Sequence, residues 1–71
     1  MEALRAYRKD NKLSQKAAAE IVGVYRESWA RWETGMRKID RKKLSDISLR
    51  TGIPKRDLRP DLAEIMREVA L

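Results

Sequence analysis

Residues 15–33 hold the pattern that most restricts how this chain can fold: two helix-length segments that meet at Gly23. Residues 17–19 are all alanine, so a second helix can approach the first one closely. Glycine adopts the left-handed backbone conformation that ends a helix without a Cβ clash. We therefore expect a first helix that ends at Gly23, a corner filled by Val24, and a second helix over residues 25–34 at roughly 90–120° to the first.

The second of these helices has two different faces. At about 100° per residue, Tyr25, Trp29 and Trp32 lie within one arc of about 80°, which we expect to face the core. The opposite arc carries two guanidinium groups and a carboxylate around a small side chain: Arg26, Glu27, Ala30 and Arg31. Such a face can contact the base edges of DNA, or it can be an ordinary solvated surface, and the spacing alone leaves both open.

Several positions of this segment match a known pattern: Gln15, Ala19, Gly23, Val24, Trp29, Trp32 and Glu33. At these positions the chain resembles the helix-turn-helix of phage repressors, and residues 23–29 look most like the Cro-type repressors of lambda-like temperate phages. The resemblance extends from about Leu4 to about Leu58. It implies an all-α fold, a compact bundle of about five short helices of the lambda-repressor-like type, and sequence-specific binding to double-stranded DNA as a transcriptional repressor.

The same resemblance implies roles for individual residues. Arg8 and Glu33 take positions where many phage repressors hold a partly buried ion pair; two exposed, unpaired charges are the alternative. Gln15 takes the position of a glutamine that contacts a phosphate and braces the first polar residue of the second helix, here Arg26; a plain surface glutamine is the alternative. Helix-turn-helix antitoxins share the motif, so an antitoxin or protein-interaction module that also binds DNA is the alternative function.

We divide the candidate DNA contacts into two groups. Arg26 and Arg31 are candidates for guanine edges in the major groove, Glu27 for a cytosine amino group, and Ala30 for a thymine methyl group or simply for space. Five of the seven positions 37–43 are basic, and three of these cations fall in the first turn of a helix, where they oppose the helix dipole. Phosphate contact explains them better than a solubilising loop does. The phosphate-contact candidates are Gln15, Tyr25, Arg37, Lys38, Arg41 and Lys42.

The composition favours an anionic partner and argues against catalysis. The chain of 71 residues carries a net charge of +6, which is large for one small domain. It contains no cysteine and no histidine, which excludes disulfides and the usual zinc sites, and no catalytic group or site for a metal, cofactor or small-molecule ligand is recognisable. It has no signal-peptide pattern, no apolar run of about 20 residues and no helix typical of a membrane surface, so we expect a soluble, cytoplasmic protein.

Charge and apolar spacing divide the chain near residue 60. Residues 60–71 have a net charge of −2, so residues 1–59 hold +8, and we expect those residues to form the DNA-binding domain. The remaining segment is predicted to be an amphipathic helix that packs on its own domain or on a second copy, with an apolar face of Leu62, Ile65, Met66 and Val69. A core this small often needs help, and helix-turn-helix proteins usually bind two half-sites about one DNA turn apart. We therefore expect a weak homodimer on a pseudo-palindromic operator.

Caps and core spacing predict the helices outside the motif. Leu4 and Tyr7 lie one turn apart on the core side of a first helix. Ser14 and Asp40 are suited to cap the N-termini of the helices that follow them. Pro60 should end the last short helix, and no segment alternates like a strand. Further residues expected in the core are Leu13, Ile21, Val22, Ile39, Leu44, Ile47, Ser48 and Leu58.

Overall fold

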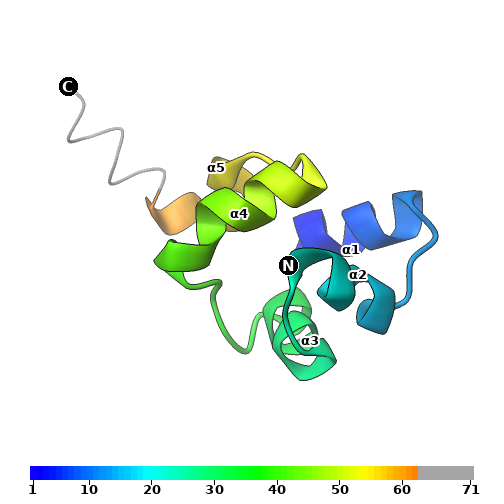
Figure 1. The fold of residues 1–71 in the computed structure, drawn as a ribbon. Helices are drawn as coiled ribbons and strands as arrows, with labels where there is room; N and C mark the ends of the chain where they lie inside the picture. Colours follow the sequence, from blue (N-terminus) through cyan, green and yellow to red (C-terminus); the bar gives the residue numbers. More distant parts are fainter. Residues whose placement is uncertain (63–71) are drawn as a thin grey trace.

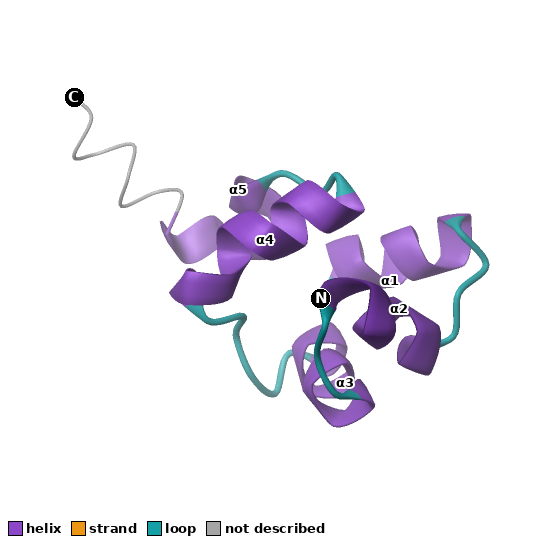
Figure 2. Cartoon of the chain, viewed as in Figure 1, coloured by secondary structure: helices purple, strands orange, loops and turns teal. Residues whose placement is uncertain are grey.

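The structure is a computed structural model that describes residues 1–62. Throughout this part of the chain the regular elements are helices, as Figure 2 shows, which confirms the all-α prediction. The elements are α1 (Glu2–Asp10), α2 (Gln15–Val22), α3 (Arg26–Thr34), α4 (Arg41–Thr51) and α5 (Lys55–Leu58) (Figure 1). α2 packs against both α3 and α4, and α1 contacts both α3 and α5.

The chain turns after α5 as predicted. α5 ends at Leu58, and Arg59 leaves the helical conformation, with φ −139° and ψ 75°. Residues 60–62 are again helical. Leu62 is half-buried against the core. The other apolar residues of the predicted amphipathic segment lie outside the described residues: Ile65, Met66 and Val69.

α2 begins and ends as the sequence predicts. The Ser14 hydroxyl accepts a hydrogen bond from the Ala17 N–H at 3.0 Å. Gly23 follows the last residue of α2 in the left-handed conformation, with φ 73°. The Val24 N–H donates to the Ala19 carbonyl at 2.9 Å, which closes the turn. A β-carbon at Gly23 would meet no atom within 4 Å, so glycine is needed there for its backbone conformation and not for space.

Ser14→Ala should lower the free energy of unfolding by about 1 kcal/mol, because the Ala17 amide loses its acceptor. In a domain of this size, that loss corresponds to a Tm lower by roughly 4–8 °C in a thermal melt followed by circular dichroism. Ser45→Ala is the matched control, because Ser45 is exposed within α4, and it should change stability by less than about 0.5 kcal/mol. Equal shifts for the two variants would contradict a capping role for Ser14.

The core draws on every helix and on the loop before α4. Trp29 is fully buried, and its ring centroid lies 6.4 Å from that of Tyr7 in α1. Ala18 and Ala19 present almost no side-chain bulk, so α2 and α3 pack closely. The buried apolar residues are Leu4, Ala18, Ala19, Val22, Trp29, Trp32, Ile39, Leu44, Ile47 and Leu58.

Two apolar residues expected in the core are exposed. Tyr25 exposes 81% of its surface, so the prediction that its ring packs in the core is wrong. It is the N-cap of α3 and has an extended backbone, so the angular spacing of helical residues does not apply to it. Ile21 is 38% exposed, because α2 buries the stripe formed by Ala18, Ala19 and Val22, and Ile21 lies at the margin of that stripe.

Glu33 is a buried carboxylate, 3% exposed, that joins α1 to α3. Arg8 donates to both of its oxygens, from Nε to Oε2 at 3.1 Å and from Nη2 to Oε1 at 2.7 Å. The Trp29 indole N–H donates to Oε2 at 2.7 Å. The Arg8 hydrogen bonds hold the pKa of Glu33 below its usual value against the opposing effect of burial, and the Trp29 bond lowers it further. This network fixes the rotation of α3 about its own axis.

Candidate nucleic-acid interface

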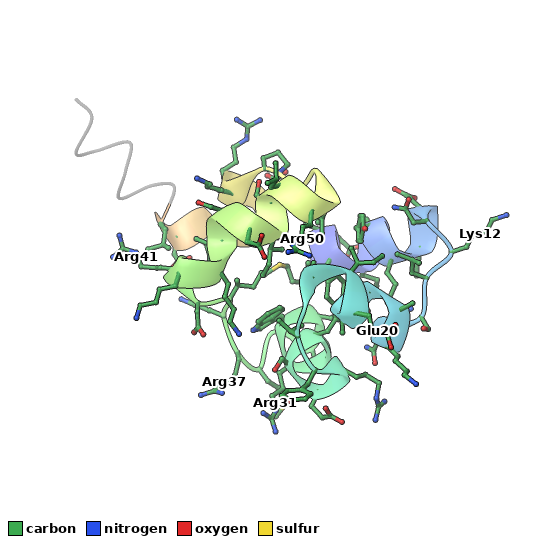
Figure 3. All side chains as sticks on the ribbon, in the orientation of Figure 1. Lys12, Glu20, Arg31, Arg37, Arg41 and Arg50 are labelled. Atoms are coloured by element: carbon green, nitrogen blue, oxygen red, sulfur yellow. The ribbon has the colours of Figure 1, made fainter. Side chains whose placement is uncertain are left out.

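The outer face of α3 carries the four residues proposed to read bases. Arg26, Glu27 and Arg31 are exposed, and Ala30 among them is half-buried. Arg26 Nη2 lies 3.8 Å from Glu27 Oε1, yet the two side chains remain 59% and 64% exposed. Figure 3 shows Arg31 pointing away from the bundle, and the Arg37 N–H of the following loop donates to the Arg31 carbonyl at 3.2 Å. Because the opposite face of α3 is held in the core, this outer face is a rigid, exposed surface.

Basic side chains surround a hollow between α3, the loop after it and the first turn of α4. The hollow has a volume of about 420 Å³. A second hollow of about 370 Å³ shares Ser28 and Lys43 with the first and extends it toward the turn between α2 and α3. The charged residues that line the first hollow are Arg31, Arg37, Lys38, Asp40 and Lys43. The phosphate-contact candidates Arg37 and Lys38 thus line the same hollow as the base-reading candidate Arg31.

The three cations at the start of α4 do not all lie on this surface. Arg41 and Lys42 are exposed but border neither of the two hollows, and Figure 3 shows Arg41 pointing outward from the start of α4. Lys43, which was not among the phosphate-contact candidates, lines both hollows. Its Nζ lies 5.9 Å from the centroid of the Trp32 ring. The missed signal was helical spacing, because Lys43 precedes buried Ile47 by four residues and so shares its face of α4.

The remaining two phosphate-contact candidates, Gln15 and Tyr25, lie at the starts of α2 and α3 respectively. Tyr25 borders the hollow that Lys43 lines and a further hollow between α2 and α3. Gln15 is the first residue of α2 and is half-buried. Its amide adds a small effect that lowers the pKa of Glu33, while Arg26 pairs with Glu27. In the described residues no hydrogen bond joins Gln15 to Arg26, and the brace between them stays a prediction.

Arg59 connects the loop before α4 to the segment after α5. Its Nη1 donates to the Ile39 carbonyl at 2.6 Å, and its Nε and Nη2 donate to the two carboxylate oxygens of Asp61 at 3.0 and 2.9 Å. The guanidinium holds the pKa of Asp61 well below its usual range. Asp61 Oδ2 also lies 3.4 Å from Lys38 Nζ. Sequence reasoning gave Arg59 no role, because none of these partners is visible from spacing along the chain.

Asp40 was predicted to cap the N-terminus of α4 with its side chain, and the structure does not show that hydrogen bond, although Asp40 takes the N-cap position. Its charge instead helps to raise the pKa of Arg59, after the larger effect of the hydrogen bonds from Arg59 to Asp61. The first turn of α4 therefore carries three cations. Its backbone N–H groups donate no capping hydrogen bond to the Asp40 side chain, so that side chain leaves them available as donors.

The charges on this surface suit an anionic partner. Within residues 1–62, no group of three or more acidic, histidine or cysteine side chains is placed to hold a metal ion. Among the same residues, none of the helices is long and apolar enough to cross a membrane. Exposed guanidinium and ammonium groups on one rigid face suit an extended anion.

Comparison with known proteins agrees with this geometry. A protein-family model described as a helix-turn-helix domain matches residues 1–59, which include α1 to α5. No curated protein and no solved structure matches the chain. The match confirms the helix-turn-helix part of the resemblance. The chain belongs to the helix-turn-helix domain family, whose members are typically DNA-binding regulators and not enzymes.

Proposed function

We propose that the protein is a Cro-type transcriptional repressor that binds a pseudo-palindromic DNA operator as a homodimer, with α3 in the major groove. One observation carries the proposal: the exposed face of α3 shares Arg31 with the basic hollow at the start of α4. The major groove of B-DNA is about 12 Å wide and accepts one helix. With α3 in the groove, its outer face meets base edges while the neighbouring cations meet phosphates.

The charges on α3 match the groups that bases present in the major groove. Arg26 and Arg31 can each donate two hydrogen bonds to guanine O6 and N7, and Glu27 can accept one from the cytosine amino group. The Arg26–Glu27 pair is exposed and therefore weak, so both side chains are free to exchange partners on DNA. Ala30 leaves room for a base edge or contacts a thymine methyl group.

Residues on both sides of the outer face of α3 are proposed to contact phosphates. Arg37 and Lys38 approach the backbone from the loop after α3, and Arg41 and Lys42 approach it from α4, whose first amides add hydrogen-bond donors. Lys43 joins this group because it lines the hollow beside Arg31. Two further candidates are Gln15 at the start of α2 and the exposed Tyr25 at the start of α3.

A homodimer gives this small surface enough specificity to act as a repressor. One copy of α3 reads one half-site, and two copies related by a two-fold axis read two half-sites about one helical turn apart. We assign DNA binding to residues 1–59 and assign residues 60–71 to packing on the domain or on the second copy. The dimer is proposed to be weak in solution and completed on DNA, in the cytoplasm of a bacterial host.

Arg31→Ala and Lys42→Ala should separate base reading from phosphate contact. Arg31→Ala should weaken operator binding by about 1–3 kcal/mol and relax selectivity at one base pair of each half-site. Lys42→Ala should weaken binding to all sequences alike and reduce the salt dependence of log K by about one. Titrations of the operator, its single-base variants and random duplex DNA at several salt concentrations measure both effects.

The two variants also serve as controls for each other. Both residues are exposed, so neither change should lower the Tm appreciably. If both variants lose the same affinity for every sequence, Arg31 does not read a base. If Lys42→Ala changes base preference and not overall affinity, the division of roles is reversed.

A further inference from the structure

We propose that Arg59 is a positioning residue for DNA binding: it holds the loop before α4 so that Lys38 reaches a phosphate, and does not touch DNA itself. The proposal rests on the DNA-binding function above and adds a residue to which the motif gives no role. Arg59 lies after α5, 20 residues beyond Ile39 in sequence, yet it binds the loop directly. We call residues 35–40 the basic loop.

The guanidinium of Arg59 is occupied within the domain. One nitrogen donates to the Ile39 carbonyl at 2.6 Å, and the other two donate to Asp61 at 3.0 and 2.9 Å. The side chain is only 14% exposed. A planar guanidinium that binds a carbonyl and a carboxylate together holds the two segments at a fixed separation, which a flexible ammonium group cannot do. Its charge is therefore neutralised inside the fold and is not directed at an external anion.

Asp61 links Arg59 to Lys38 of the basic loop. Asp61 is oriented by Arg59 and lies 3.4 Å from Lys38 Nζ, whose side chain is 69% exposed. An ion pair this exposed is weak, so it can orient Lys38 and still release it to a phosphate. Ile39, next in the chain, is fully buried and has its carbonyl bound by Arg59. On the other side of Lys38, the Arg37 N–H donates to the Arg31 carbonyl at 3.2 Å. The basic loop is therefore held on both sides of Lys38 before DNA arrives, which reduces the entropy lost on binding.

Arg56 provides the matched comparison. It is an exposed arginine in α5, three residues before Arg59. Arg59→Gln and Arg56→Gln each remove one positive charge, and the two positions are three residues apart, so their effects on the long-range field are similar. They differ in their contacts within residues 1–62, because Arg59 donates to the Ile39 carbonyl of the basic loop at 2.6 Å and Arg56 makes no hydrogen bond to that loop.

The experiment measures binding of the full chain to a labelled duplex of random sequence, about 30 base pairs long, by fluorescence anisotropy over a series of salt concentrations. Arg59→Gln should lower affinity by about fivefold to tenfold near 0.1 M salt and reduce the salt slope by about one, as expected for one lost phosphate contact. Arg56→Gln should lower affinity by less than about twofold, because it changes only the distant field.

A double-mutant cycle tests whether Arg59 acts through Lys38. Lys38→Gln should reduce affinity and salt slope as Arg59→Gln does, and the double variant should lose no more than either single variant. Direct phosphate contact by both residues predicts that the two losses multiply. Arg59→Lys keeps the charge but cannot bind Ile39 and Asp61 together, so its affinity should stay low.

Circular dichroism melts set a temperature at which every variant is folded. If Arg59→Gln does not fold, Arg59→Lys and Asp61→Asn replace it in the same cycle. Affinity equal to that of Arg56→Gln, or losses that multiply with Lys38→Gln, would overturn the proposal. Random DNA probes phosphate contacts alone, so a wild type that binds it and selects no operator would contradict the repressor function and leave the Arg59 result intact.

Discussion

Trp29→Ala is expected to remove most of the stability of the fold. Truncating a buried tryptophan lowers the free energy of unfolding by about 3–5 kcal/mol, whereas a chain of this length is stable by only about 4–10 kcal/mol. Trp29 is fully buried at the centre of the core and its indole N–H donates to Glu33 at 2.7 Å. Alanine would leave a large cavity and would remove one of the two hydrogen bonds that Oε2 of Glu33 accepts, so that only the bond from Arg8 Nε remains. DNA binding should then fail through unfolding and not through a lost contact.

Denaturant unfolding followed by circular dichroism measures this loss. Trp29→Phe keeps much of the volume but lacks the indole donor, so it should be destabilised by about 1–3 kcal/mol. Tyr25→Ala is the control: that aromatic residue is 81% exposed, and its change should move stability by less than about 0.5 kcal/mol. An unfolding curve for Trp29→Ala that matches the wild type would contradict the account of the core.

Glu33→Gln is expected to have the second largest effect on stability. Removing one partner of a fully buried ion pair costs about 3–5 kcal/mol. Glutamine can still accept one of the bonds made to Glu33, and the Arg8 side chain is 23% exposed, so water can solvate it. We therefore expect Glu33→Gln to lower the free energy of unfolding by about 2–3 kcal/mol at neutral pH. Glu20→Gln is the matched control, because Glu20 is exposed in α2 and its change should be nearly neutral.

The pH dependence of stability gives a separate test of Glu33. Its pKa in the folded protein is lower than its usual value of 4.5, chiefly because Arg8 donates to the charged form. The unfolded chain therefore takes up a proton first as the pH falls. The stability that Glu33 contributes is fully present above the usual value and is lost as the pH falls through the lower folded value. The free energy of unfolding of Glu33→Gln should therefore fall less on acidification than that of Glu20→Gln. An equal fall for both variants would contradict the pairing of Glu33 with Arg8.

The sequence predicts those parts of the fold that depend on neighbouring residues. The end of α2 at Gly23 and its start at Ser14 follow from backbone and capping chemistry within a few residues. Helical spacing correctly puts Trp29 and Trp32 in the core, because both lie well inside α3. It fails for Tyr25, because that residue caps α3 in an extended conformation before the helical spacing begins.

The parts of the candidate site that the sequence did not predict depend on contacts between distant segments. The role of Arg59 depends on partners in the loop before α4 and just after α5, which only the fold brings together. Asp40 has the composition of a cap, but its side chain makes no capping bond, and its charge acts on Arg59 instead. Lys43 was closer to being predictable, since it is exposed one helical turn before buried Ile47 and so lies at the margin of the face that α4 packs on the core.

The measurement that tests the central claim most directly is selection of binding sites from random duplex DNA by the wild-type protein, repeated at two salt concentrations. If α3 reads the major groove from a two-fold dimer, selection should yield a pseudo-palindromic consensus with half-sites about one helical turn apart, at both salt concentrations. Binding that falls steeply with salt and enriches no sequence would contradict the claim and leave only attraction between a basic surface and phosphates.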